Sequence, residues 1–71
     1  MTEEEIKRLE KDVKKYKRLA SEQAMELHDL IEDKLPEAYS ELLGIAQATY
    51  VACKNWDDAT QKLLAAQAET V

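Results

Sequence analysis

Pro36 is the residue that most constrains the fold of this chain, because it is the only proline among 71 residues and stands at the midpoint. Proline cannot continue an α-helix, and it disfavours the helical conformation at the preceding residue, here Leu35. It is well tolerated in the first turn of a following helix. The sequence therefore predicts two helices of nearly equal length, residues 3–33 and 36–68, joined by a turn at about residues 34–36.

The first predicted helix has a start signal and a regular apolar pattern. Thr2 followed by Glu5 has the spacing of a capping box, so the helix is expected to begin at about Glu3. The a positions of a heptad repeat are Ile6, Val13, Ala20 and Leu27, and the d positions are Leu9, Tyr16, Gln23 and Leu30. Oppositely charged residues four apart predict three ion pairs along this helix, Glu3–Lys7, Glu4–Arg8 and Glu10–Lys14.

The second predicted helix continues the same type of pattern from near Pro36. Its a positions are Tyr39, Ala46, Cys53, Thr60 and Gln67, and its d positions are Leu42, Thr49, Trp56 and Leu63. Cys53 at an a position is expected to be a small, buried hydrophobic residue. Further apolar residues at e positions make both stripes wider than a two-stranded seam needs, namely Ile31, Leu43, Tyr50 and Leu64.

Matched helices joined by a short turn predict an all-α fold, an antiparallel two-helix hairpin. A core of this size rarely stabilises a chain by more than about 3–5 kcal/mol. The surplus apolar surface therefore predicts self-association into a four-helix bundle, as a homodimer or a larger assembly. The expected oligomer core is Leu9, Val13, Tyr16, Leu27, Leu30, Leu42, Tyr50, Trp56 and Leu63.

Composition excludes several classes of protein. The single cysteine rules out an internal disulfide and a Cys-rich metal site. The acidic N-terminus lacks the features of a signal peptide, and no apolar run has the length of a membrane span, so a cytoplasmic protein without a membrane partner is expected. The sequence offers no nucleophile–base pair, phosphate loop or paired-carboxylate site, so we expect neither an enzyme nor a bound cofactor.

Four outward-facing residues near the predicted turn are the main candidates for a binding site: Met25, His28, Asp29 and Glu32. The hairpin core requires none of them, so they form either a solvated helix face or a docking patch for a protein partner. A third interpretation is a metal- or cofactor-handling site, because His28 and Glu32 are four residues apart beside Asp29. The ferritin-type Glu-x-x-His spacing is absent, since position 25 is Met. The chain has no second histidine, so no metal site is predicted.

Charge is distributed unevenly along the chain. Residues 7–18 contain seven cations and two anions, whereas residues 22–41 contain seven acids and one lysine. The cations form an outward basic stripe whose main members are Arg8, Lys11, Lys15 and Arg18. This stripe is either a solvated exterior, a secondary docking patch for an acidic protein surface, or an RNA-binding surface. A net charge of −5 and the absence of an aromatic residue for base stacking argue against a nucleic-acid partner.

The segment around Pro36 resembles a known family. Met25, Leu27, His28, Asp29, Leu30 and Glu32, followed by Leu35 and Pro36, match a "K-M-D-L-H-D-L-A-E-x-L-P" stretch. That stretch links two long helices in the Rop-like family of small proteins associated with nitrogen fixation, whose genes often lie beside cofactor-assembly genes such as NifX. This chain has Glu26 where the family tends to Asp, Ile31 where it tends to Ala, and an additional Lys34 in the turn.

The resemblance implies a function that the residues alone do not. It implies a non-enzymatic accessory protein in nitrogen fixation that binds nitrogenase or a cofactor-assembly protein through an exposed helical face. The protein that gives the family its name binds paired RNA loops across such a face, which keeps an RNA-binding bundle as an alternative. The family has no established catalytic residues, so the resemblance implies none here.

Overall fold

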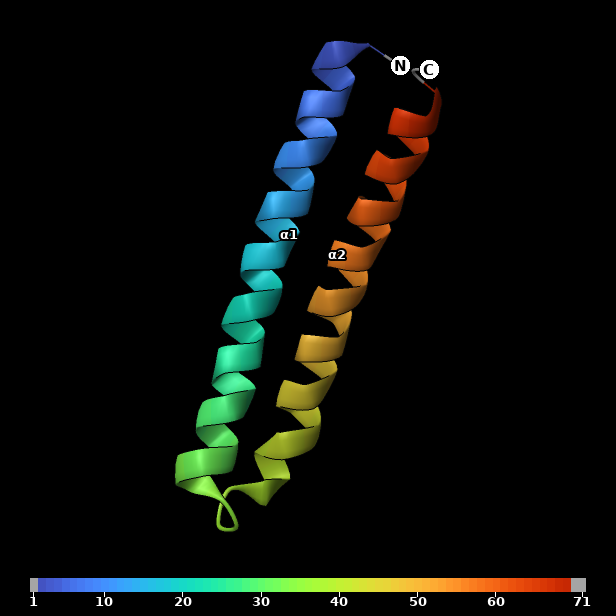
Figure 1. Cartoon of the computed structure of the whole chain (residues 1–71). Coiled ribbons are helices and arrows are strands. Elements are labelled where there is room, and N and C mark those ends of the chain that lie inside the picture. Colours follow the sequence, from blue (N-terminus) through green and yellow to red (C-terminus); the bar gives the residue numbers. More distant parts are fainter. Residues whose placement is uncertain (1, 70–71) are drawn as a thin grey trace.

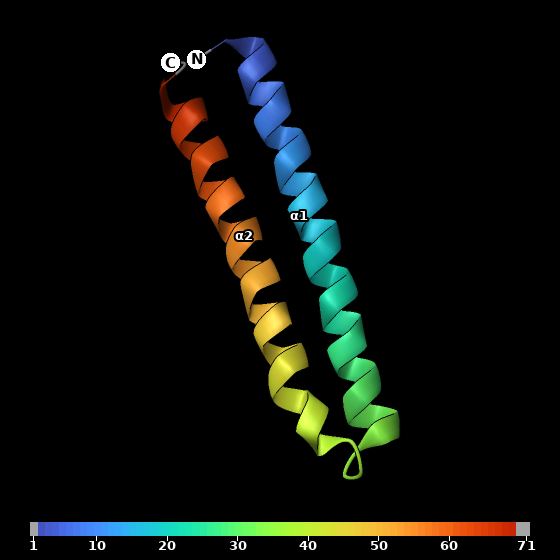
Figure 2. The same ribbon diagram turned by 180° about the vertical axis from the view of Figure 1, so that it is seen from behind.

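The computed structural model describes residues 2–69, which form one antiparallel helical hairpin 53 Å long (Figure 1). Helix α1 spans Glu3–Asp29 and continues as a π-helical segment, η1, over Leu30–Lys34. A turn at residues 35–38 and a 3₁₀ turn, η2, at Tyr39–Glu41 lead into helix α2, Leu42–Glu69. The start of α1 and the end of α2 lie at the same end of the hairpin (Figure 2). The predicted all-α hairpin is confirmed.

The N-terminus of α1 is capped as its sequence predicts. Thr2 has an extended backbone, and its hydroxyl accepts a hydrogen bond of 3.2 Å from the backbone N–H of Glu5. This bond satisfies one of the helical N–H groups that have no partner within the helix. The three glutamates of the first turn lie at the positive end of the helix dipole, which further favours the helix start here.

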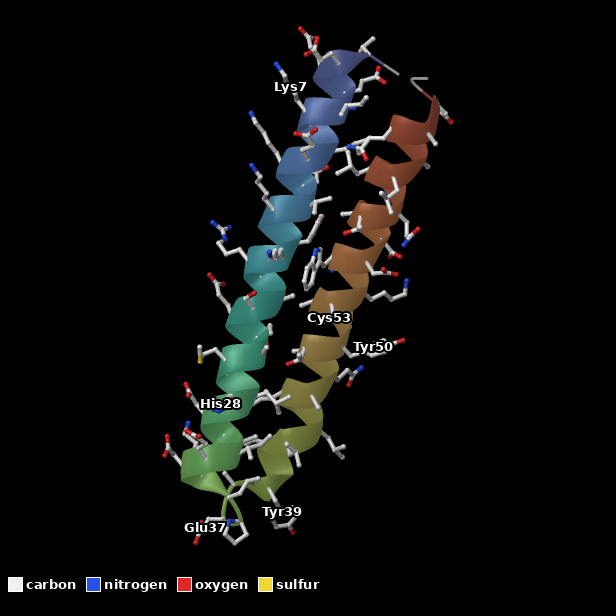
Figure 3. The ribbon with its side chains drawn as sticks, in the orientation of Figure 1. Lys7, His28, Glu37, Tyr39, Tyr50 and Cys53 are labelled. Atoms are coloured by element: carbon white, nitrogen blue, oxygen red, sulfur yellow. The ribbon has the colours of Figure 1, made fainter. Side chains whose placement is uncertain are left out.

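The turn follows from Pro36, but the second helix begins later than the sequence suggests. Leu35 is extended, with φ −89° and ψ 149°, as expected before a proline, and the Leu35–Pro36 peptide is cis. The expected start of the second helix was near residue 36, whereas regular α2 begins at Leu42. Glu37 therefore lies in the turn rather than at the start of a helix (Figure 3).

The packing of α1 onto α2 follows the predicted heptad on α1 but is rotated on α2. Leu30, the first residue of η1, is 2% exposed, and on α1 Ala20 is buried while Leu9, Val13 and Leu27 are half-buried. On α2, the d positions Leu42, Thr49, Trp56 and Leu63 are half-buried, as is Tyr16 opposite them on α1. The positions beside d, however, are also turned toward α1, and these are Ile45, Ala52, Ala59 and Ala66.

This rotation corrects an expectation about α2: Cys53, expected to be buried at an a position, is exposed. Tyr39, also assigned to an a position, lies in η2 before α2 begins and is 71% exposed. The physical reason is that Ala59 and Ala66 are small, so their side of α2 can approach α1 closely and is buried in preference to the a positions. Because the seam lies on the alanine side, Cys53 is turned to the flank of the hairpin.

One side chain in the seam also ties the helices together by a hydrogen bond. Thr49 donates to the backbone carbonyl of Ile45 at 2.8 Å and lies 3.3 Å from the carbonyl of Gln23 on α1. A hydroxyl in a packed seam needs such a partner, because an unpaired polar group loses its hydration without compensation. Thr49 is thus accommodated at a d position that would otherwise favour an apolar residue.

Candidate functional site

The turn-proximal patch consists of Met25, His28, Asp29 and Glu32, and the structure places all four on the outer surface of α1 and η1. Met25 is 61% exposed, and the other three side chains are exposed to a similar degree. None of them takes part in packing α1 onto α2. Folding of the hairpin therefore does not require these particular residue types in the patch.

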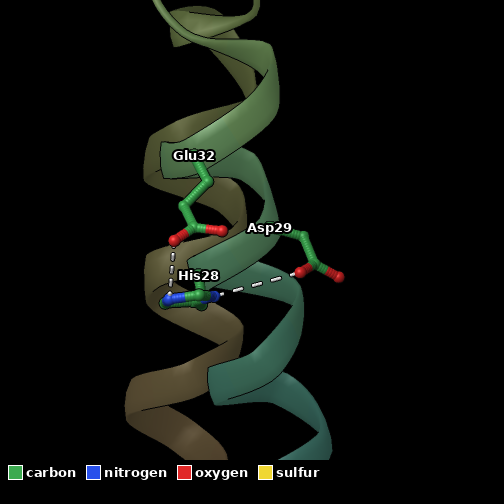
Figure 4. Close-up of polar contacts among 3 residues, drawn as sticks. All are labelled: His28, Asp29 and Glu32. Carbon is green, nitrogen blue, oxygen red and sulfur yellow. Dashed lines mark ion pairs between the residues drawn. The ribbon is translucent and has the colours of Figure 1, made fainter.

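His28 organises the polar part of this patch (Figure 4). Its Nε2 lies 3.3 Å from Oε1 of Glu32, one helical turn on, and its Nδ1 lies 4.0 Å from Oδ1 of Asp29. The imidazole thus stands between two carboxylates. When protonated it neutralises part of their charge, but exposed pairs of this kind contribute little to stability. The arrangement orients polar groups outward, where a partner can reach them.

An apolar component lies beside the polar one. Ser21, Ala24, Met25 and His28 line a shallow hollow on the α1 surface. The methionine side chain is flexible and polarisable, so it adapts to the shape of a partner surface. Polar and apolar contacts therefore lie side by side in the turn-proximal patch.

The metal interpretation of this patch gains no support from the geometry. Within residues 2–69, no group of three or more His, Cys, Asp and Glu side chains is arranged to hold a metal ion. The carboxylate of Asp29 lies on one side of the His28 ring and that of Glu32 on the other, so the three do not converge on one point (Figure 4). The cluster is a set of ion pairs rather than a set of ligands.

The basic stripe is the second candidate surface, and its main members Arg8, Lys11, Lys15 and Arg18 are all exposed. Three of these, together with Lys14, line a shallow hollow on α1. Lys7 projects from the same helix away from α2 (Figure 3). Lys15 also lies over the ring of Tyr16, with its Nζ 5.7 Å from the ring centroid.

The ion pairs predicted for this part of α1 are wrong. The part of the chain that the structure describes contains three ion pairs, two at His28 and one between Lys54 and Asp58. Glu3–Lys7, Glu4–Arg8 and Glu10–Lys14 are not among them. Long exposed side chains lose conformational entropy when they pair, and in water this loss offsets most of the attraction. The basic stripe therefore has no ion-pair partner within residues 2–69.

An apolar groove on one flank of the hairpin is the third surface. It is lined by Val13, Lys17, Cys53, Trp56, Asp57 and Thr60. Leu43, Tyr50 and Leu64 share the heptad position of Asp57, so they lie on the same stripe of α2 on either side of the groove. They are 82%, 68% and 52% exposed, and Tyr50 projects away from α1 (Figure 3). This apolar flank is the surplus surface expected from the sequence, and its residue Tyr50 lies outside the core of the single hairpin.

The comparisons with known proteins agree with this architecture. The family model described as Rop-like matches residues 4–68, nearly the whole of the hairpin. The chain belongs to the Rop-like family. Two relatives are each named "UPF0437 protein". That of Azorhizobium caulinodans is 39% identical over 59 residues, covering 83% of this chain and 84% of the relative. That of Nostoc sp. is 34% identical over 61 residues, covering 86% and 84%.

No solved structure matches the chain. Among the described residues, no helix combines the length and apolar character that crossing a membrane requires. The family assignment and the hairpin are thus established together, while the names of the relatives describe no activity.

Proposed function

We propose that this Rop-like chain is a non-enzymatic accessory protein of nitrogen fixation, acting in the cytoplasm. In this proposal it binds nitrogenase or a nitrogenase cofactor-assembly protein through the turn-proximal patch. The observation that carries the proposal is the exposure of Met25 beside the oriented side chains of His28, Asp29 and Glu32. Exposed residues that packing does not require are candidates for recognition. The link to nitrogen fixation rests on the resemblance of the segment around Pro36 to its nitrogen-fixation-associated members.

Self-association through the apolar flank is part of the same proposal. The hairpin is only 14 by 12 Å in cross-section, so a second hairpin is needed to cover Leu43, Tyr50 and Leu64. Large exposed apolar side chains gathered on one stripe beside an apolar groove are typical of an interaction site. A four-helix bundle formed in this way leaves the turn-proximal patch on its outside, because the patch lies away from the groove. The homodimer would therefore present two copies of the patch to partners.

The test uses purified nitrogenase components and cofactor-assembly proteins as separate probes against immobilised, full-length chain. Replacing both His28 and Asp29 by Ala should weaken binding to one probe at least about tenfold, since two polar contacts at an interface are lost. Helicity and oligomeric mass should stay unchanged, because exposed substitutions usually alter stability by less than about 0.5 kcal/mol.

A matched control is available on α2. Lys54 and Asp58 form an exposed ion pair 3.1 Å long, and replacing both by Ala removes a similar set of charges away from the patch. This control should bind as the wild type does. If the patch variant and the control bind every probe with wild-type affinity, or if no probe binds the wild type, the proposal is wrong.

A further inference from the structure

The outward stripe of α1 is divided into two halves of opposite charge. The stripe is a single line of exposed residues at alternating spacings of three and four along α1 and η1. Its first half is the basic stripe, Arg8, Lys11, Lys15 and Arg18, and its second half is Glu22, Met25, Asp29 and Glu32. The boundary between the halves lies between Arg18 and Glu22, at the level of the buried Ala20. Between Arg8 and Glu32, every charged residue before Ala20 on this line is a cation, and every one after it is an acid. Glu4, one step before Arg8 on the same line, is an acid and lies outside the paired stretch.

Helix stability does not explain this division. The negative end of the helix dipole is at the C-terminus of α1, where acids are unfavourable and cations favourable. Asp29 and Glu32 lie at that end, the opposite of the favourable arrangement. Ion pairing within α1 does not explain it either, because none of the four cations has an ion-pair partner within residues 2–69. The pattern therefore calls for a partner outside the single hairpin.

The pattern is complementary to itself when a second copy of α1 is turned end over end. Residues equidistant from Ala20 then lie opposite one another. Arg8 meets Glu32 of the second copy, Lys11 meets Asp29, Lys15 meets Met25, and Arg18 meets Glu22. In two antiparallel helices, side chains at these two heptad positions lie in the same layers, so the pairing is sterically consistent along a line of roughly 36 Å.

We propose that the outward stripes of α1 from two copies of this chain pair antiparallel across a two-fold axis near Ala20, with basic halves on acidic halves. Each unlike pair occurs twice, as in any isologous contact. The contact lies on the side of α1 that faces away from the apolar groove, so it joins bundles already formed through the apolar flank. It also covers the turn-proximal patch, and self-pairing and partner docking therefore exclude each other.

The contact is weak and sensitive to salt. Exposed ion pairs are individually small, and the Debye length shrinks from about 30 Å at 0.01 M salt to about 3 Å at 1 M. Self-association through this stripe is measured with the purified chain alone, so the result does not depend on which protein partner binds the turn-proximal patch. Its failure and the failure of partner docking are thus separate results.

The experiment is sedimentation velocity of the full-length chain at ~20 mM and ~500 mM NaCl, a range that spans strong and weak screening. Low salt should produce an assembly larger than that present at high salt. In Lys11→Glu, the new glutamate of each copy faces Asp29 of the other, so two acids repel at two points of the contact. In Asp29→Lys, the new lysine of each copy faces Lys11 of the other, so two cations repel at the same two points. Each variant alone should weaken the low-salt association by roughly tenfold or more.

Mixing the two variants supplies the decisive readout. In a mixture of Lys11→Glu chains with Asp29→Lys chains, unlike charges again face each other at both points, so the larger assembly should return. The control is Lys62→Glu, an exposed site on α2 with the same change of net charge, which should associate by itself as the wild type does.

Three results would overturn the proposal: no larger assembly at low salt, equal effects of Lys11→Glu and Lys62→Glu, or no recovery in the mixture. Recovery only when an unrelated acidic helical peptide is added would assign the basic stripe to a foreign acidic partner instead.

Discussion

Replacement of Leu43 by alanine distinguishes a monomeric hairpin from one that self-associates through its apolar flank, because the expected loss of stability differs between the two. Complete burial of a leucine side chain stabilises a protein by about 1.5–3 kcal/mol. Leu43 is 82% exposed in the single hairpin, so less than a fifth of that contribution is present there. In an isolated hairpin, Leu43→Ala should therefore cost less than about 0.5 kcal/mol, and the higher helix propensity of alanine offsets part of it.

The expected cost is much larger if the flank is covered by a second chain. Each chain then loses most of the burial of one leucine, about 1.5 kcal/mol, and a homodimer loses this twice. A total near 3 kcal/mol corresponds to a dissociation constant raised about 100-fold. We expect this larger effect, measured as the concentration at which the mass from light scattering falls to that of one chain. Urea unfolding at several protein concentrations should show the same loss.

Two controls frame this measurement. Leu30 is 2% exposed within the hairpin, so Leu30→Ala should cost about 2–5 kcal/mol at any protein concentration. Val51 is exposed on α2 but does not share the heptad position of Leu43, so Val51→Ala should change the dissociation constant little. If Leu43→Ala leaves both the mass and the stability as unchanged as Val51→Ala does, the apolar flank is not the surface of self-association.

Two further predictions concern α2. A Cβ atom added at Gly44 meets nothing within 4 Å, so Gly44→Ala should raise the free energy of unfolding by up to about 1 kcal/mol. If urea denaturation instead gives a lower free energy of unfolding for this variant, another chain packs closely against Gly44. The hydrogen bond from Lys54 to Asp58, together with the carboxylate charge, raises the Lys54 pKa above 10.5. Since the folded-state pKa is the higher one, the contribution of the pair to stability is present at neutral pH and lost as the pH rises through that pKa. In Asp58→Asn, NMR titration should show the Lys54 pKa returning toward 10.5, and an unchanged pKa would show that Asp58 is not its cause.

The hairpin could be derived from local signals alone. Thr2 and Glu5 mark the start of α1, Pro36 breaks the helix and holds Leu35 extended, and the heptad of α1 places Leu30 in the seam. Each of these depends on a few neighbouring residues and on backbone sterics, which a single sequence records. The outward position of the turn-proximal patch followed from the same heptad, because the register of α1 in the structure is the predicted one.

The start of α2 could not be derived in this way. Pro36 is compatible with the first turn of a helix, yet the chain uses residues 35–38 as a turn and begins regular α2 at Leu42. The two long helices pack antiparallel, and the conformation of the connection at residues 35–41 is set by the need to reverse the chain between them. The absent ion pairs on α1 have a similar origin, since the spacing permits them but solvation decides whether they form.

The sequence by itself determined that the chain forms two amphipathic helices, where the first begins, and which residues interrupt them. The tertiary structure alone decided which side of α2 meets α1. The apolar stripe of α2 is wide enough that either of two faces could pack against α1, one centred on Cys53 and the other on Ala59 and Ala66. Ala59 and Ala66 permit the closer approach of the two backbones, so their side is buried. This preference depends on how the two helices fit together, so it cannot be read from either helix alone. It leaves Cys53, Leu43 and Tyr50 on the surface that a second chain can cover.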